Sequence, residues 1–348
     1  SLAGCNFPAQ VQPTPTPAPT NTPPPTPTPL PTDMPLPSPT FTLEPTATQP
    51  PPTANPPTAH PATPTAATKA ALAVQFPLTV NDDLKTAVTL KAAPQRIVSL
   101  APSHTEILFA LGLGDRVVGV TTYCDYPEEA KSKEKVGGFS KIDLEKVVSL
   151  SPDLVLGTSL HAQTVAPALR ERGLTVALFD PRTVDDTLAR ILMVGRLTGR
   201  AQEAQDLVTG LQARLDAVTS KVAQAKTRPR VFWELTADLH SAGKGSFVHD
   251  IITRAGGENV GARLQGEWPQ FNLEALVAAD PEVIVLADHA FGETASKVKQ
   301  RPGWAGMSAV KQGRIVEVED INVVSRPGPR VVQAVEMIAR ALHPDLIK

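Results

Sequence analysis

The sequence predicts an α/β protein made of two related lobes that a helical segment connects. Three observations support this prediction. The stretch 93–127 reads as a strand, a helix and a second strand. The phrase at 143–156 returns in the same order of residue types at 272–286. The segment 185–226, which lies between the two copies, carries leucine and valine at helical intervals and has no pattern typical of a strand.

The first lobe is predicted to begin with a buried strand over Arg96–Leu100, a short apolar run bounded by prolines. The spacing of Ser103–Glu106 fits a capping box, so a helix should start there and end at the glycines that follow. Val117–Thr121 is the next predicted strand. The aromatic loop Tyr123–Pro127 follows its carboxyl end, which is where open α/β sheets bind ligands.

The other elements alternate between strand and helix, which is typical of parallel βαβ units. Asn81 and Asp82 fit a hairpin turn ahead of the first lobe. Further strands are expected at 154–156, 175–178, 230–234, 283–286 and 314–318, and further helices at 163–172, 246–255 and 330–342. Short helices should follow the caps Asp143 and Asn272. Each lobe is therefore expected to be Rossmann-like.

The N-terminal segment is expected to be a disordered tether. Of the 36 prolines in the chain, 22 lie between Asn6 and Ala70, together with 16 threonines and three charged residues. This composition cannot bury enough apolar surface to offset the entropy of ordering. We therefore expect a processing site at 1–5, a linker at 6–75, a first lobe at 76–183, a helical connection at 184–227 and a second lobe at 228–348.

Leu2-Ala3-Gly4-Cys5 is similar to the cleavage site of bacterial lipoproteins, in which the cysteine carries a diacylglycerol. The alternative is a chance match. Lipidation of Cys5 would place the protein outside the cytoplasm, anchored to the outer face of the bacterial cytoplasmic membrane, and two or three acyl chains would hold it there stably.

The composition excludes several classes of function. The formal net charge of −2 favours neither nucleic acid nor an anionic membrane surface as a partner. The two cysteines cannot build a structural zinc site. Ser103, His104 and Glu106 have the residue types of a catalytic triad, but neighbours on one helical turn cannot take its three roles. We predict neither an enzyme nor a catalytic cofactor.

Several separated motifs, in order, resemble the substrate-binding proteins of ABC importers. They are RIVSLAPSHTEILFALGLGDRVVGVTTYCDYPEEA, DLEKVVSLSPDLVL, GEWPQFNLEALVAADPEVIVL and RPGPRVVQAVEMIARAL, and the match spans about Pro94 to His343. The chain most resembles the helical-backbone class, class III, and within it the members that bind cobalamin. The resemblance implies two α/β lobes bridged by a long helix, with a macrocyclic corrinoid held in the cleft. It also implies a monomer that docks onto a membrane permease with its ATPase.

The resemblance places ligand-binding side chains at Tyr123, Phe139, Trp268, Asn322 and Arg326. Tyr123 and Trp268 match aromatic residues of the family's cleft, and Phe139 and Asn322 stand where cobalamin binders have Trp and Asp. Aromatic faces from opposing lobes suit a large flat ring. The alternative for each aromatic residue is ordinary half-buried packing.

Glu145 and Glu274 occupy the same place in the two copies of the repeated phrase. They match the family's glutamates that pair with arginine pockets of the permease, and Arg binds carboxylates in a bidentate fashion. The alternative is a favourable interaction of each carboxylate with a helix N-terminus.

Haem or a ferric siderophore is the alternative ligand within the same class. His161, His240, His289 or Cys124 could then contact the ligand's metal, although surface or core placement is the alternative for each. Two alternatives come from other classes of protein: a sensor that works without a transporter, and an enzyme that acts on a corrinoid or a metal chelate.

Overall fold

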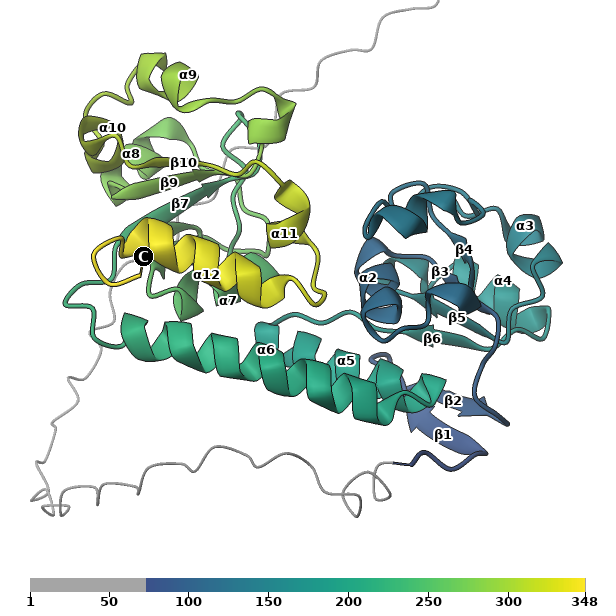
Figure 1. The fold of residues 1–348 in the computed structure, drawn as a ribbon. Coiled ribbons are helices and arrows are strands. Elements are labelled where there is room, and N and C mark those ends of the chain that lie inside the picture. The colour runs from purple at the N-terminus through teal and green to yellow at the C-terminus, as the bar shows by residue number, and fades with distance from the viewer. Residues whose placement is uncertain (1–72, 348) are drawn as a thin grey trace, which may run out of the picture. The chain divides into compact units, whose positions relative to one another are not determined.

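The computed structural model describes residues 73–347, all of which belong to one compact unit of the chain, 62–348. The expected lipidation at Cys5 and the tether up to residue 72 lie outside the described residues. The described part forms two α/β lobes, and a long helix, α6 (Ala201–Val222), runs along both of them (Figure 1). This arrangement confirms the predicted fold class.

The sheet of the first lobe contains four parallel strands in the order β4-β3-β5-β6. These are β3 (Ile97–Ser99), β4 (Val117–Val120), β5 (Leu154–Gly157) and β6 (Val176–Leu178). Nearly every strand residue is buried, because helices cover both faces of a parallel sheet and leave no side for water. The continuous apolar runs in the sequence follow from this burial.

Three α-helices accompany this sheet, namely α2 (Pro102–Ala110), α3 (Leu144–Ser149) and α4 (Val165–Glu171). The predicted capping box at Ser103–Glu106 is wrong. Ala101 is the N-cap of α2, no side chain caps the helix, and Pro102 begins it. Proline suits that position because its missing N–H would have no partner there. Glu106 is therefore free to point elsewhere.

A hairpin of β1 (Leu78–Asn81) and β2 (Ala87–Leu90) precedes the first lobe. Its turn spans 82–86, so it begins at the predicted Asp82, whereas Asn81 is the last residue of β1. The buried carboxylate of Asp82 accepts hydrogen bonds from the backbone N–H groups of Leu84 and Thr86 inside the turn. Its second oxygen accepts from the N–H of Leu178 on β6. This one side chain both closes the turn and fastens the hairpin to the sheet edge.

The second lobe repeats the plan with the order β10-β9-β7-β8, again all parallel. Its strands are β7 (Arg230–Glu234), β8 (Glu258–Asn259), β9 (Val283–Leu286) and β10 (Ile315–Glu317). Its helices are α7 (Phe247–Arg254), α8 (Leu273–Ala279), α9 (Ala295–Gln300), α10 (Ser308–Gln312), α11 (Ile321–Ser325) and α12 (Val331–Leu342). Short 3-10 turns, η1 to η5, lie at 114–116, 128–132, 159–161, 260–263 and 289–291.

Two helices, rather than a single one, connect the lobes. α5 (Val184–Thr198) ends at Gly199 in the left-handed conformation, and α6 begins two residues later. α5 contacts α2 of the first lobe and α7 of the second, and α6 packs along α5 and α12. The bridge between the lobes is therefore a packed helix pair with contacts on both sides.

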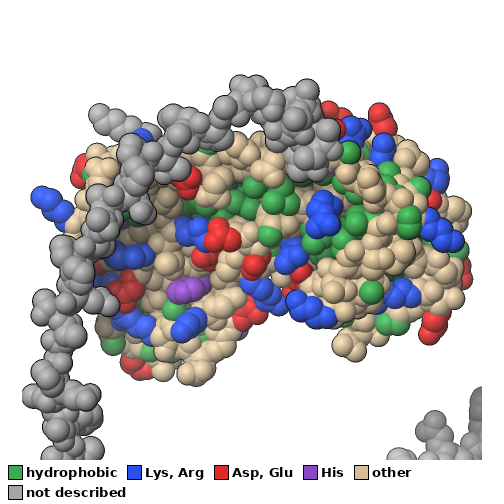
Figure 2. Space-filling model, turned by 90° about the horizontal axis from the view of Figure 1, so that it is seen from below, with side chains coloured by type: hydrophobic (Ala, Val, Ile, Leu, Met, Phe, Trp, Pro, Cys, Tyr) green, Lys and Arg blue, Asp and Glu red, His purple; other side chains and the backbone are tan. Residues whose placement is uncertain are grey.

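On the face of the described residues that Figure 2 shows from below, neither positive nor negative side chains form a continuous patch. Lys and Arg side chains are interspersed there with Asp and Glu over both lobes (Figure 2). No helix within 73–347 has the length and apolar character needed to cross a membrane.

Candidate ligand-binding cleft

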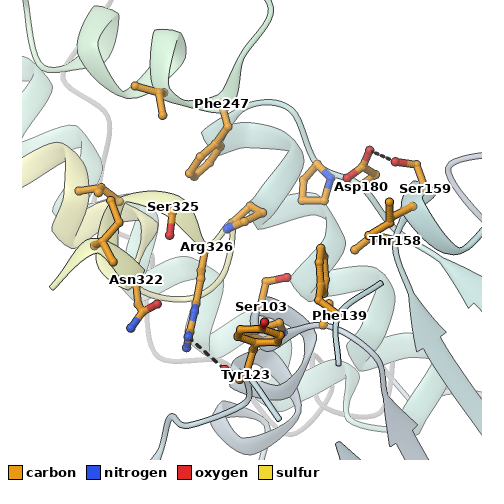
Figure 3. Close-up of a pocket in the computed structure, with 18 of the residues that line it drawn as sticks. Ser103, Tyr123, Phe139, Thr158, Ser159, Asp180, Phe247, Asn322, Ser325 and Arg326 are labelled. Atoms are coloured by element: carbon orange, nitrogen blue, oxygen red, sulfur yellow. Dashed lines mark hydrogen bonds between the residues drawn. The ribbon is translucent and has the colours of Figure 1, made fainter. Parts of the chain in front are cut away.

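A cavity of about 1000 Å³ opens between the two lobes (Figure 3). Its walls come from the loops after β3, β4, β5 and β6 on one side and from β7, α7, α11 and the loop around Trp268 on the other. The structure brings together all five residues predicted to bind ligand, which are Tyr123, Phe139, Trp268, Asn322 and Arg326. Their contact with a ligand stays a prediction.

Tyr123 and Phe139 supply the aromatic wall of the first lobe, and their rings lie close together in Figure 3. Tyr123 is 60% exposed, so its ring is offered to the cavity rather than buried in the core. Phe139 lies in a tight turn in which the N–H of Gly138 donates to the carbonyl of Lys141. Both rings therefore belong to loops that the sheet and a turn hold in place.

His161 supports Phe139 from behind and does not line the cavity. Its Nδ1 accepts the backbone N–H of Thr158 at 3.0 Å, so Nε2 carries the proton and donates to the Phe139 carbonyl at 2.9 Å. The two rings meet edge to face, 5.6 Å between centroids. Burial lowers the pKa of His161, which favours the neutral form that this arrangement needs.

Trp268 provides the aromatic surface of the second lobe and is 50% exposed. Its loop is fixed on both sides, because the N–H of Gly243 donates to the Glu267 carbonyl and the N–H of Ser241 to the Pro269 carbonyl, both at 2.8 Å. An added Cβ at Gly243 would lie 2.2 Å from the carbonyl oxygen of Gly266. Only glycine permits this close approach, which holds the Trp268 loop at the cavity.

Sequence reasoning missed Phe247 and Trp233, which also line the cavity. Phe247 is the first residue of α7, directly after the N-cap Ser246, and Figure 3 shows its ring across the cavity from Tyr123. The capped start of α7 was predictable, but the direction in which its first side chain points was not. Trp233 is buried on β7, and its Nε1 has no hydrogen-bond partner among the described residues.

The guanidinium group of Arg326 donates most of its hydrogen bonds to other groups of the protein. Its Nη1 donates to Asp125 at 2.7 Å and to Glu106 at 3.2 Å, and its Nη2 donates to the Tyr123 carbonyl at 3.1 Å. Partial burial raises the pKa of Asp125, but the Arg326 guanidinium outweighs it and holds that pKa below its ordinary value. Arg326 therefore ties the second lobe to the first beside the predicted ligand position. Asn322, on the same segment, lines the cavity on α11.

A second ion pair between the lobes lies at the other end of the cavity. Arg182 pairs with Glu267 and also donates to Asp180 at 3.0 Å. All three residues line the cavity. The side chain of Arg182 is half exposed, so water screens this pair more than the one at Arg326.

The residues considered as metal ligands lie away from the cavity wall. Cys124 is buried, and its Sγ lies 3.1 Å from the Thr105 hydroxyl and 3.2 Å from that of Thr121. His240 pairs with Asp238 at the surface, and Nδ1 of His289 lies 2.7 Å from the Glu293 carbonyl. Among the cavity-lining residues of 73–347, none is His, Cys or Met.

Glu145 and Glu274, the predicted docking residues, are both exposed. They lie in the first turns of α3 and α8, whose N-caps Asp143 and Asn272 accept the backbone N–H groups three residues on. Neither glutamate forms an ion pair within the part of the chain that the structure describes. The repeated phrase therefore presents one unpaired carboxylate on each lobe.

Two parallel-sheet lobes, a helical bridge and one aromatic cavity define a ligand-binding protein of the two-lobed, helical-backbone kind. The model of the periplasmic binding protein family matches residues 97–321. An uncharacterized ABC transporter substrate-binding lipoprotein of Bacillus subtilis is 38% identical over 78% of this chain and 88% of its own length. A cobalamin-binding protein of Halobacterium salinarum is 33% identical over 78% of this chain and 75% of its own.

Among solved structures, a periplasmic haem-binding protein from Roseiflexus in its apo form superimposes with a TM-score of 0.65 at 28% identity, covering 73% of this chain and 99% of that one. The chain therefore belongs to the periplasmic binding protein family, whose members are substrate-binding proteins of ABC transporters. The relatives above are named as binding proteins and not as enzymes.

Proposed function

We propose that this protein captures cobalamin or a related corrinoid in the cavity between its lobes and delivers it unaltered to an ABC permease. The observation that carries the proposal is the cavity of about 1000 Å³ with aromatic side chains from both lobes in its walls. A flat macrocycle with amide substituents needs such faces for its rings and a few polar groups at its edge. The cobalamin-binding relative supports the same ligand class.

The lining residues favour a corrinoid over haem. Protein-bound haem iron takes an axial ligand from His, Cys, Met or Tyr. In the described cavity wall only Tyr123 offers such a group. A corrinoid that carries its own axial ligands makes no such demand on the protein, so the observed wall suits it without further residues.

Titration of the purified protein with cyanocobalamin and with haemin, followed by calorimetry and visible absorbance, tests the proposal. We expect saturable heat with cyanocobalamin. An absence of binding to cyanocobalamin together with a shifted haem absorbance band would contradict the corrinoid assignment.

Haem is the second candidate, because Tyr123 is exposed in the cavity and the haem-binding structure above has the same fold. Tyr123→Phe separates the two ligands, since it keeps the aromatic face and removes the phenol oxygen. A corrinoid held by stacking should bind this variant nearly as before. Haem coordinated by the phenolate should lose its axial ligand and change its absorbance spectrum.

We further propose that lipidated Cys5 holds the protein at the outer face of the cytoplasmic membrane. The support is the Leu2–Cys5 motif and the lipoprotein name of the Bacillus relative. Expressed behind a bacterial lipoprotein signal sequence, the protein should fractionate with membranes, and Cys5→Ser should release it. A membrane-bound Cys5→Ser variant would contradict this anchor.

A further inference from the structure

Glu106 is a buried carboxylate in the first lobe whose partners both come from the second. It is 3% exposed on α2 and does not line the cavity. Arg330 binds it through two donors, Nε at 2.9 Å and Nη2 at 2.7 Å, and Arg326 adds a contact at 3.2 Å. The carboxylate therefore joins the lobes at one end of the cleft.

The same two arginines hold the aromatic loop of the first lobe. Arg326 donates to the Tyr123 carbonyl at 3.1 Å and to Asp125 at 2.7 Å. The Arg330 guanidinium lies 4.2 Å from the centre of the Tyr126 ring, a cation–π distance. Each arginine thus contacts Glu106 and the 123–126 loop at once.

We call these groups the Glu106 cluster, which consists of Glu106, Asp125, Asp320, Arg326 and Arg330. Its three carboxylates face two guanidinium groups, because Arg330 also pairs with Asp320 at 3.0 Å. The side chains of Arg326 and Arg330 are only 11% and 12% exposed. Burial lowers the pKa of Arg330, but Glu106 and Asp320 outweigh it and raise that pKa overall.

Neutralising Glu106 would leave these two guanidinium groups close together in a poorly solvated place without the carboxylate they share. Removal of one partner from a buried charged network is costly, because the remaining charge loses its compensation. Asp125 and Asp320 lie toward the solvent and retain one arginine each. The arginines would therefore move toward these outer carboxylates, and the loop they hold would move with them.

We propose that Glu106 is a positioning residue for ligand binding, which acts through Arg326 and Arg330 to fix Tyr123 at the cavity wall and to set the spacing of the lobes at that end. The proposal rests on the proposed function only in taking Tyr123 as a ligand contact. A site whose side chains are held before the ligand arrives binds more tightly, because less ordering remains to be done.

The chain contains two tyrosines, Tyr123 and Tyr126, and both lie in the loop that the cluster holds. Incorporation of 3-fluorotyrosine into the full chain therefore gives a fluorine NMR spectrum with one resonance for each, assigned with Tyr126→Phe. The test compares Glu106→Gln, which keeps the size of the side chain and removes its charge, with Glu336→Gln. The control variant removes a bidentate pair with Arg214, between α12 and α6 and away from the cavity.

We expect Glu106→Gln to shift or broaden both fluorine resonances and to weaken cyanocobalamin binding about tenfold, because the loop must then be ordered by the ligand. Glu336→Gln should change neither. If Glu106→Gln fails to fold, Asp125→Asn removes one outer contact of Arg326 and should shift the Tyr123 resonance in a folded protein.

Unchanged fluorine resonances in Glu106→Gln, or in Asp125→Asn where that variant is the one used, would overturn the positioning role. An equal loss of affinity in Glu336→Gln would overturn it too, since the effect would then be one of general stability. If the parent protein binds no cyanocobalamin, the corrinoid assignment fails, but the fluorine comparison still decides whether Glu106 holds Tyr123.

Discussion

Trp268 owes its half-exposed position to its local backbone. Pro269 biases the preceding residue toward an extended conformation, and the 241–243 segment holds the loop through hydrogen bonds on either side of the tryptophan. A loop whose backbone is held in this way loses little freedom when its aromatic side chain stacks on a ligand. Trp268 has the properties of an anchor residue.

Truncating this ring should therefore weaken binding strongly. We expect Trp268→Ala to reduce the affinity for cyanocobalamin by about 2 kcal/mol or more, measured by calorimetry. Trp304→Phe serves as a comparison, because Trp304 is buried against Phe232 and Arg301 and does not line the cavity. Unchanged affinity in Trp268→Ala would remove this residue from the proposed site.

The burial of His104 should make the stability of the protein depend on pH. Burial lowers its pKa to about 4 from the ordinary 6.5, and its Nδ1 has no partner among the described residues. The unfolded chain therefore takes up this proton before the folded one does. The contribution of neutral His104 to the unfolding free energy is therefore complete above about pH 6.5. It is lost as the pH falls toward 4.

We expect the parent protein to lose about 3 kcal/mol more unfolding free energy than His104→Leu between pH 7 and pH 4. Urea denaturation at the two pH values measures this difference. His240→Gln, at a partly exposed histidine, is the control and should follow the parent. Parallel losses in the parent and in His104→Leu would show that folding does not lower the pKa of His104.

The family resemblance of the sequence predicted three of the aromatic residues that line the cleft, Tyr123, Phe139 and Trp268, but neither Phe247 and Trp233 nor the contacts of Glu106. Tyr123 and Trp268 could be found because short motifs surround them. The sequence around Glu106 fits a capping box equally well, and its real partners lie more than 200 positions along the chain. No local pattern contains that information.

At the scale of elements, the contact between α5 and α6 depends on a glycine. A Cβ added at Gly195 would lie 2.3 Å from the Cβ of Ala204 and 2.8 Å from the Arg200 carbonyl oxygen. These helices form the bridge between the lobes, so this close crossing sets how tightly the bridge is packed. Gly210 on α6 is exposed, and nothing lies within 4 Å of an added Cβ there.

The two glycines should respond in opposite directions. Gly195→Ala should destabilise the protein by about 2 kcal/mol, because the added methyl group forces the helices apart. Gly210→Ala should stabilise it by up to about 1 kcal/mol, since alanine favours the helix. Thermal unfolding of both variants checks the pair, and a stabilised Gly195→Ala protein would contradict the packing argument.

The capped helices α3 and α8 were predictable because their information is local. Asp143 and Asn272 each lie directly before a helix and accept one of its free backbone N–H groups. The repeated phrase therefore contains both the capping residue and the helix that it caps. The break between α5 and α6 was harder to foresee. Gly199 could have ended a helix or sat within one, and the packing against both lobes decided between these outcomes.

The repeated carboxylates on these helices should act in transport and not in ligand capture. We expect Glu145→Ala combined with Glu274→Ala to leave cyanocobalamin affinity unchanged and to abolish uptake in cells that depend on this protein. Single variants should lose part of the uptake, because one carboxylate of the pair remains for the permease arginines. Normal uptake by the double variant would contradict the docking role.

At the scale of the whole molecule, the alternation of strands and helices predicted two parallel-sheet lobes, but not their strand orders. The βαβ rule fixes parallel pairing and leaves open the side on which each new strand is added. In both lobes the first strand of the sheet ends up in the interior, at β3 and at β7, and the later strands pair on either side of it. The strand order depends on which helices pack together against the sheet. That packing involves the complete chain and not one local segment.

The packed bridge and the ion pairs at both ends of the cleft argue against a large closing motion. α5 touches a helix of each lobe, and Asp185 and Asp250 both bind Arg254 where α5 meets α7. A rotation of the lobes would have to break these contacts together with those of Glu106. Ligand binding should therefore further protect the loops that line the cavity and leave the bridge as it is.

Hydrogen–deuterium exchange of the full chain, with and without cyanocobalamin, measures this directly. We expect increased protection in the loops 122–126, 137–142 and 266–270 and in the segment 321–327, which contains α11, because these residues line the cavity or flank those that do. Amides of α5, α6 and the Gly199–Arg200 junction should exchange at unchanged rates, because a packed helix pair resists bending. A large ligand-dependent change at that junction, with little at the loops, would mean that the lobes close by a hinge, and the cavity seen here would then be one of two states.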